Sequence, residues 1–379
     1  MAGRMLPKRF TYPSPGFSHY WNYGSGKQML LKLDHVPSKE EVESYAFLLA
    51  KGDPLADEVI REVYDKTGFH KANELLNQIL EKGIEAVDGV PDSLKKLFGD
   101  TDQIPEWLDA DLLQTGSAFC RRSGYFALVV LRNYCLMGGY ESSAINKPLI
   151  YTAALKKGAA KRMAETIEFW VNITGEDALK RFESGYKSTV KVRIMHAFAR
   201  VSIQKMPGWE NETWGVPINQ WDLIATNLGF SLVFLEGLKK LGFRPTRKEI
   251  RAVLHFWKYV GYLLGISASN LPDTEKEAIE SLYKWTISQS PADTDTKELA
   301  KALLHSHVKI GKLLLQCDVC QARKPECEFA VKDASDQECF TYPASTVQGY
   351  KLGFGRSQFF VEDRYFFFPA YEHLLSFWL

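Results

Sequence analysis

The sequence predicts a mainly α-helical protein. Apolar residues recur at a spacing of three to four through most of the chain, as in residues 70–84. Helix-start signals are frequent, for example Ser38 with Glu41 and Thr246 with Glu249, which have the capping-box spacing. Alternating strand patterns are sparse, and no internal repeat or low-complexity linker interrupts the chain. We therefore expect one large helical domain.

The 379 residues divide into three parts by pattern. Residues 1–36 are rich in Tyr, Phe, Pro and Gly, and we expect them to form an irregular N-terminal arm. Residues 37–316 carry the helical periodicity and form the predicted all-α domain. Residues 317–379 show less regular patterns, and we expect an irregular C-terminal appendage.

The helices can be placed in chain order from their start and stop signals. Ser38 caps the first, Pro54 stands in the first turn of the next, and 105–109 form a turn into a helix that runs through Phe119. An apolar helix over 124–137 ends at Gly138-Gly139. The remaining predicted helices cover 148–156, 158–171, 175–185, 186–205, 219–240, 247–265, 273–288 and 296–316.

Composition and charge limit the classes of partner. Formal net charge is +1, so no global field favours nucleic acid or anionic lipid, and we predict no nucleic-acid partner. Aromatic residues make up 13% of the chain, which suits an apolar ligand site as well as a plain aromatic core. We expect a small apolar substrate. The sequence leaves a homo-oligomer open.

The targeting and cysteine patterns suggest a cytoplasmic protein. The N-terminus lacks the apolar core of a secretory signal, and the longest apolar run, 125–131, is too short to span a bilayer. Six cysteines without such a signal are expected to be reduced thiols. Four of them follow residue 316, and zinc binding, a disulfide and free thiols all remain open for this group: Cys317, Cys320, Cys327 and Cys339.

The most informative residue is His196. At helical spacing it shares one face with Val192, Ala199 and Ile203. An imidazole on an otherwise apolar face needs a partner, which is either a hydrogen bond in the core or a metal. One neutral imidazole is enough to hold the iron of a haem.

An upstream helix carries a second polar group of residues. Arg162, Glu165, Thr166 and Phe169 recur at helical spacing, so a cation, a carboxylate and a hydroxyl are predicted to line one side of it. This helix and the one with His196 could face each other across a cofactor. Arg193 and Arg200 flank His196, where they could meet haem propionates or simply face solvent.

Several ordered motifs resemble a known family. They are Arg162-x-x-Glu165-Thr166, Val192-Arg193-x-x-His196-Ala-x-x-Arg200, Trp214-Gly-Val-Pro217-Ile-Asn-Gln220-x-Asp222-Leu223 and, more weakly, Gly52-Asp-Pro-Leu-Ala-Asp57 and Pro105-x-Trp107-Leu-Asp109. In order and spacing they resemble the haem-dependent oxygenases that include bacterial rubber oxygenases (latex-clearing proteins) and the fungal prenyl-cleaving oxygenase of mycophenolic acid synthesis. The resemblance covers roughly residues 45–265 and implies a globin-like helical haem-binding domain.

The resemblance also implies roles for single residues. His196 matches the ligand of a haem b iron, and Arg162 and Thr166 match residues on the opposite side of that haem. Position 165 departs from the rubber oxygenases, which have a lysine where this chain has Glu165. Glu165 could act as a general base, as could Glu141, whose match is looser and which could equally be a helix-start carboxylate.

The implied activity is oxidative cleavage of a carbon–carbon double bond by O2, giving carbonyl products. Two alternatives stay open: a haem monooxygenase or peroxygenase, and a haem- or apolar-ligand-binding protein without turnover. We interpret Gln220 and Asp222 as helix-start residues with an architectural role. His255, His305 and His307 are interpreted as structural or exposed.

Overall fold

Helices account for the regular structure of the described residues, which are 6–152 and 159–305 of a computed structural model. Within these ranges no strand forms, and a single isolated bridge pairs Ser142 with Pro291. The mainly α class predicted from the sequence is confirmed. The chain divides into two units, Met1–Ser306 and His307–Leu379, and every described residue belongs to the first.

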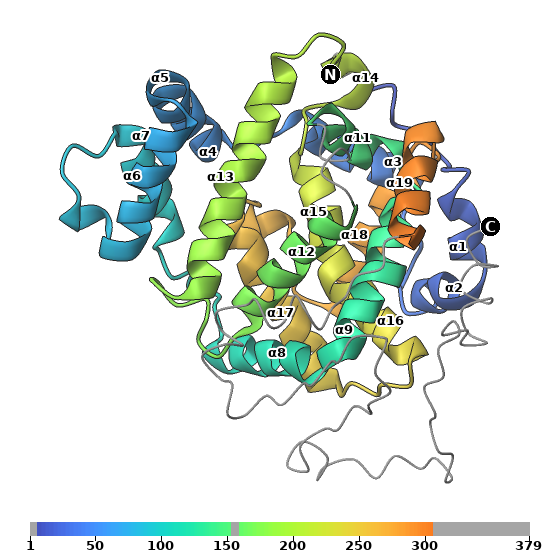
Figure 1. Ribbon diagram of the computed structural model, residues 1–379. Coiled ribbons are helices and arrows are strands. Elements are labelled where there is room, and N and C mark those ends of the chain that lie inside the picture. The colour runs from blue at the N-terminus through green and yellow to red at the C-terminus, as the bar shows by residue number, and fades with distance from the viewer. Residues whose placement is uncertain (1–5, 153–158, 306–379) are drawn as a thin grey trace, which may run out of the picture. The chain divides into compact units, whose positions relative to one another are not determined.

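Figure 1 shows the helices, labelled and coloured in the order in which they follow along the chain. The first half supplies mostly short ones: α1 (Phe17–Asn22), α2 (Gly24–Leu30), α3 (Lys39–Tyr45), α4 (Pro54–Val59), α5 (Asp65–Thr67), α6 (Phe69–Lys82), α7 (Asp92–Thr101), α8 (Ala110–Arg122), α9 (Gly124–Val130), α10 (Met137–Gly139) and α11 (Ser143–Tyr151). The second half supplies α12 (Ala159–Thr174), α13 (Ser184–Gln204), α14 (Asn211–Trp214), α15 (Gln220–Leu228), α16 (Phe234–Lys240), α17 (Arg247–Leu263), α18 (Glu275–Thr286) and α19 (Thr294–His305).

Short 3₁₀ and π segments continue or join these helices. The 3₁₀ segments are η1 (Ala46–Ala50), η3 (Ile84–Ala86) and η7 (Ala268–Asn270). The π segments are η2 (Ile60–Tyr64), η4 (Leu131–Leu136) and η6 (Gly229–Val233). Because π segments widen the turn without ending the helix, the predicted helix over 219–240 forms as α15, η6 and α16 in succession.

The two predicted capping boxes are present. The Ser38 backbone N–H donates to Glu41 at 2.7 Å, and the Ser38 hydroxyl accepts from the Glu41 N–H. The Thr246 N–H donates in the same way to Glu249 at 2.7 Å. These reciprocal bonds satisfy N–H groups that would otherwise lack partners, and they fix the starts of α3 and α17.

The core is built around the close packing of α8 on α17. A Cβ at Gly116 would collide with the backbone of Ala252 and would lie 2.7 Å from Phe256 Cβ, so only glycine allows this approach. Beside the contact, Trp257 of α17 stacks on Phe230, with ring centroids 4.8 Å apart, and on Trp170 at 5.7 Å. Part of the high aromatic content therefore serves as core.

Two predictions about irregular and helical segments are wrong. Residues 17–30, expected to be part of an irregular arm, form α1 and α2 and bury Phe17 and Trp21. Residues 175–183, expected to begin a helix, form turns in which Asp177 and Phe182 have φ values of 53° and 73°. A left-handed residue ends a helix, so α13 begins only at Ser184.

The N-terminal segment is anchored by a buried network. Arg9 donates to both carboxylate oxygens of Asp222, at 2.7 and 2.8 Å, and to Gln289 at 2.9 Å. Asp222 also accepts from the indole N–H of Trp285 at 3.1 Å. Arg9 is 3% exposed and Asp222 5%, so both charges depend on each other for solvation.

No helix in the described part of the chain combines the length and hydropathy needed to cross a bilayer, as predicted. The predicted boundary between a domain ending at 316 and an appendage over 317–379 lies outside the described residues. The same holds for His307 and for the four cysteines Cys317, Cys320, Cys327 and Cys339.

Candidate functional site

The helices α12 and α13 form a hairpin joined by the turns at 175–183. They touch at Gly185, where a Cβ would lie 2.8 Å from the Asn172 carbonyl oxygen and 2.9 Å from Ile173 Cα. The helices run in opposite directions (Figure 1), and each rises about 1.5 Å per residue. Position 162 lies eleven residues from Ile173 on α12, and His196 lies eleven residues from Gly185 on α13. The two positions are therefore at the same height along the hairpin.

His196 lies on a half-buried side of α13. Its side chain is partly exposed and its Nδ1 atom is closed off from solvent. Val192 and Ala199, on the same face, are also only half-buried, whereas Ile194 and Ala197 belong to the core. An imidazole within a half-buried apolar stripe, level with a second helix, is a donor that fits a haem iron.

The two described polar side chains of the α12 motif, Glu165 and Thr166, differ in exposure. The core face of α12 consists of Met163, Ile167 and Trp170, each less than 5% exposed. Thr166 flanks this face and is half-buried, whereas Glu165 is exposed on the opposite side of the helix. The Arg162 side chain lies outside the described residues, so its prediction rests on the helix position alone.

Arg193 is fully buried and does not face solvent. Its Nε donates to Asp53 Oδ2 at 2.7 Å and its Nη2 to Asp53 Oδ1 at 3.1 Å. Its Nη1 donates to the Thr101 hydroxyl at 3.1 Å, with Asp100 at 3.4 Å. Burial lowers the pKa of Arg193, but attraction to Asp53 outweighs it and the pKa is raised.

Arg200 has a comparable environment two turns later on α13. Its Nε donates to Asp57 at 2.8 Å and its Nη1 to the Ile218 carbonyl at 2.8 Å, while its Nη2 is buried without a hydrogen-bond partner. Arg200 is 1% exposed. The solvent-facing alternative is therefore wrong for both arginines, and their contact with haem propionates stays a prediction.

Two aspartates were not recognised as part of this site from the sequence. Asp53 caps the N-terminus of α4, and Asp57 lies one turn further on the same helix. The two arginines, seven apart, share one face of α13, and each bonds one of the two aspartates, which are four apart. This pairing explains why the motif 52–57 accompanies the motif around His196, and it fixes α13 against α4.

Two glycines close over these ion pairs. A Cβ at Gly265, where φ is +83°, would collide with Asp53 Oδ2 and would lie 2.6 Å from Arg193 Nε. A Cβ at Gly52 would lie 2.9 Å from Arg200 Nε. Backbone therefore covers both guanidinium groups and excludes water from them.

Glu141 lies in the turn before α11. A Cβ at Gly16, which precedes α1, would be 3.5 Å from its Oε2, so the carboxylate lies beside the start of that helix. Burial raises the pKa of Glu141, and Lys297 opposes the rise. A carboxyl group with a raised pKa keeps its proton more readily, which suits a proton-transfer role, although its place beside α1 fits the helix-terminus alternative equally well.

The residues interpreted as architectural have partners of that kind. The Gln220 amide donates to the carbonyls of Gly52 and Gly265, at 3.0 and 2.9 Å. The Asp222 carboxylate accepts the two hydrogen bonds from Arg9 described above. His255 accepts from the Asp109 backbone N–H at 2.9 Å, which supports its structural interpretation.

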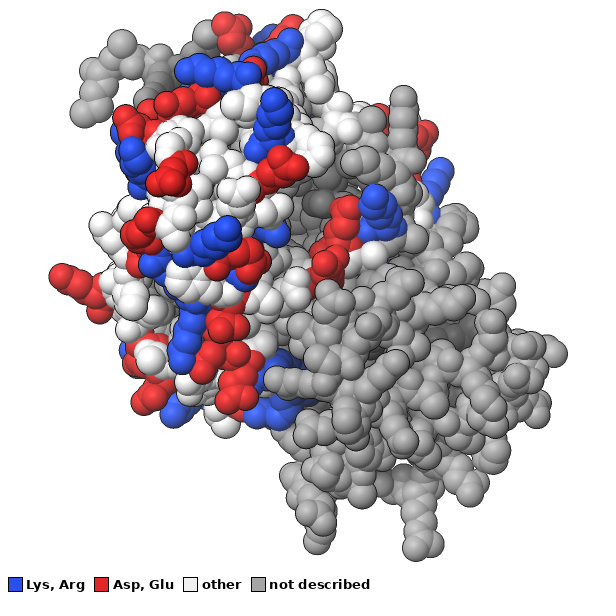
Figure 2. Space-filling model, turned by 60° about the vertical axis from the view of Figure 1, so that its left-hand side comes forward, with Lys and Arg blue, Asp and Glu red and all other residues white. Residues whose placement is uncertain are grey.

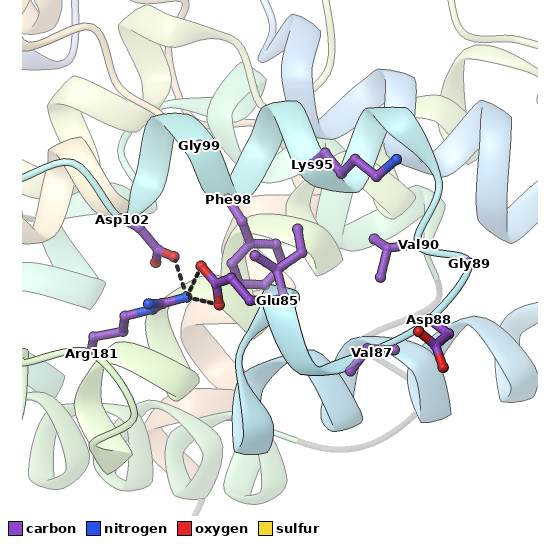
Figure 3. A pocket seen from close by; sticks show the side chains of 11 residues that line it. Glu85, Val87, Asp88, Gly89, Val90, Lys95, Phe98, Gly99, Asp102 and Arg181 are labelled. Carbon is purple, nitrogen blue, oxygen red and sulfur yellow. Dashed lines mark hydrogen bonds and ion pairs between the residues drawn. The ribbon is translucent and has the colours of Figure 1, made fainter.

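A groove of about 490 Å³ lies between the turn at 84–90 and α7 (Figure 3). Arg181 points between Asp102 and Glu85, with ion pairs of 2.9 and 3.1 Å. His196 does not line this groove. Its charged rim is unlike the apolar pocket expected for the substrate, and Arg181 already has two carboxylate partners.

Comparison with known structures identifies the class of fold. The chain aligns with the latex clearing protein LCP in its closed state with a TM-score of 0.59, over 72% of this chain and 71% of that one, at 22% sequence identity. At that identity the likeness shows the fold alone. The chain therefore has the helical fold of that protein.

Sequence comparison identifies the family. The profile described as "ER-bound oxygenase mpaB/B'/Rubber oxygenase, catalytic domain" matches residues 124–326, and the chain belongs to this family. It is 27% identical to the rubber oxygenase of Streptomyces sp. (strain K30) over 226 residues, or 59% of this chain. The match spans 55% of that relative, so the chain spans about half of its length.

Proposed function

We propose that this protein is a haem b-dependent oxygenase that uses O2 to cleave a carbon–carbon double bond of an apolar, isoprenoid-like alkene to carbonyl products. Membership of the oxygenase family supports the reaction class. The single structural observation that carries the proposal is His196, half-buried on an apolar stripe of α13 and level with α12. A bound haem would supply the redox chemistry of O2.

The roles of the residues follow from their positions. The His196 imidazole would hold the iron, and the ion pairs of Arg193 and Arg200 would keep its helix from rotating. The Thr166 hydroxyl and the Arg162 guanidinium would orient polar atoms of the bound reactants by hydrogen bonds. Half-buried Val192 and Ala199 would exclude water from the site.

Proton handling is assigned to a carboxylate. Glu141 is favoured by its partial burial and raised pKa. Glu165 is exposed, and in this role it would have to be covered when the substrate binds. In either case the carboxylate would hold or release one proton during carbonyl formation.

The cofactor is tested by the ultraviolet–visible spectrum of the purified full chain. We expect a Soret band that is lost in His196→Ala and kept in His255→Ala, because His255 is bonded to the Asp109 backbone. A colourless wild-type protein that takes up no added haem would contradict the proposal.

The reaction is tested with ¹⁸O2 and a linear polyisoprene. Cleavage by a dioxygenase puts one labelled atom in each carbonyl fragment. Label in an intact, oxygenated chain would instead indicate a monooxygenase or peroxygenase.

A second candidate is a haem- or apolar-ligand-binding protein without turnover, favoured by the exposure of Glu165. It predicts a Soret band with no labelled product. For either candidate we propose a cytoplasmic location.

A further inference from the structure

An exposed face combines aromatic and basic side chains where α8 meets α9 and α16 meets α17. We call it the basic–aromatic face and define it by eight residues: Arg122, Tyr125, Phe126, Leu241, Phe243, Arg244, Arg247 and Lys248. In Figure 1 these helix ends lie along the lower edge of the described helices.

Direct contacts make this face continuous, although it is formed by two segments, 122–126 and 241–248, that are more than a hundred positions apart in the sequence. The rings of Phe126 and Phe243 meet edge to face, with centroids 5.7 Å apart. Arg122 forms an ion pair with Glu249 in the first turn of α17. The turn at 122–126 and the loop at 241–248 therefore form one surface.

The apolar part of the face is unusually open to solvent. Tyr125 is 54% exposed, Phe126 46% and Leu241 36%. Single exposed apolar residues are common, but two rings and an aliphatic chain grouped together indicate a contact surface.

The basic part is not explained by the stability of the fold. Arg247 and Lys248 occupy the first two positions of α17, where the positive end of the helix dipole disfavours cations. Neither is in an ion pair with a described residue, and Arg244 donates only to backbone carbonyls, such as that of Phe243 at 3.0 Å. Glu249 is already occupied by Arg122 and Thr246. The face therefore keeps a net positive charge.

This arrangement differs from the surface over α5–α7 and α13. There Lys and Arg side chains are interleaved with Asp and Glu (Figure 2). Pairs such as Lys96–Glu58, Lys205–Asp65 and Lys187–Glu81 neutralise one another. A net formal charge of +1 thus conceals a local concentration of positive charge.

We propose that the basic–aromatic face docks the protein on the surface of an anionic lipid membrane, without spanning it. Tyrosine and phenylalanine rings with a leucine insert at the level of the headgroups, while arginine and lysine attract anionic phosphates. Nucleic acid would account for the cations and rings but leaves Leu241 without a partner. A second copy of the chain would bring like charges together.

Docking goes beyond the proposed function and does not depend on it, since binding to a membrane is measured without turnover. It would also give an oxygenase access to apolar substrates dissolved in lipid.

The proposal is tested by co-flotation of the full chain with vesicles of phosphatidylcholine, with and without phosphatidylserine. We expect binding that requires phosphatidylserine and falls with salt.

Arg247→Gln with Lys248→Gln should weaken this binding by about tenfold or more, because each cation near an anionic surface contributes several-fold to the affinity. Tyr125→Ser with Leu241→Ser should weaken it comparably. The matched control is Lys71→Gln with Lys82→Gln on α6, two exposed lysines whose removal should leave binding unchanged.

Insertion is tested separately with Tyr125→Trp and, as control, Phe69→Trp. Brominated lipids should quench the tryptophan at 125 and not the one at 69. Circular dichroism of each variant confirms that the fold is kept. The proposal is overturned if the wild type does not float with anionic vesicles, if the α6 control loses as much affinity, or if the charge variants lose self-association or RNA binding instead.

Discussion

Arg193 and Asp53 form a two-point ion pair whose side chains are only 3% and 4% exposed. The pair joins α13, which carries His196, to the first residue before α4, 140 positions earlier in the chain. Because Arg193 precedes His196 by less than one helical turn, this contact fixes the direction in which the imidazole points.

Breaking this pair should destabilise the protein strongly. Arg193→Met or Asp53→Asn alone should lower the free energy of unfolding by about 3–5 kcal/mol, because each leaves a buried charge without its partner. The double variant should lose less than the sum of the two. Urea denaturation of the four proteins measures the coupling, and strict additivity would show that the two side chains act independently. Lys96→Met, which breaks an exposed pair with Glu58, is the control and should have little effect.

Gly265→Ala should be destabilising for two reasons. The residue has φ +83°, and its new methyl group would collide with the Asp53 carboxylate. We expect a loss of at least about 2 kcal/mol in thermal or urea unfolding. Gly242→Ala separates the two causes, since φ there is +94° but nothing lies within 4 Å of the added Cβ. Equal losses of stability in the two variants would mean that the Arg193–Asp53 ion pair can move aside for the added methyl group.

Glu141 should make stability depend on pH. Its folded pKa is raised above 4.5 by burial, so the native state binds the proton more tightly than the unfolded state. Its contribution is therefore complete below pH 4.5 and is lost as pH rises through the raised pKa. Glu141→Gln should remove this decline, which is measured as the difference between the melting temperatures of the two proteins across that range. Parallel curves for the wild type and the variant would contradict the raised pKa.

Glu165 provides a test of the proton-handling role without a change in fold. Because its side chain is exposed, Glu165→Ala should leave the melting temperature unchanged. If Glu165 transfers a proton, turnover should fall by about a hundredfold. Glu168→Ala is the matched control, an exposed glutamate on the same helix. Equal turnover in both variants would assign the role to another group, with Glu141 the next to test.

The parts of the fold that local signals determine were predictable from the sequence. The capping boxes at Ser38 and Thr246 each need only four consecutive residues, and both form as expected. The helical class also follows from local periodicity. The helix predicted over 175–185 failed because glycine at 175 and left-handed Asp177 and Phe182 override the propensity of the residues between them.

The site was predictable only in part, because its geometry depends on pairs distant in sequence. The apolar stripe around His196 is visible from spacing within one helix. The ion pairs beside this stripe are not visible from the sequence. Arg193 meets Asp53, and Arg200 meets Asp57, only because α4 packs on α13. The exposure of Glu165 likewise follows from which side of α12 meets the core.

The bond between Arg9 and Asp222 has a consequence for the order in which the molecule assembles. The partners of Arg9, Asp222 and Gln289, are synthesised 213 and 280 positions after it. The guanidinium must therefore stay hydrated until synthesis has passed these two partners. The segment around Arg9 is thus synthesised well before α15 and α18, and it reaches its native place only after them.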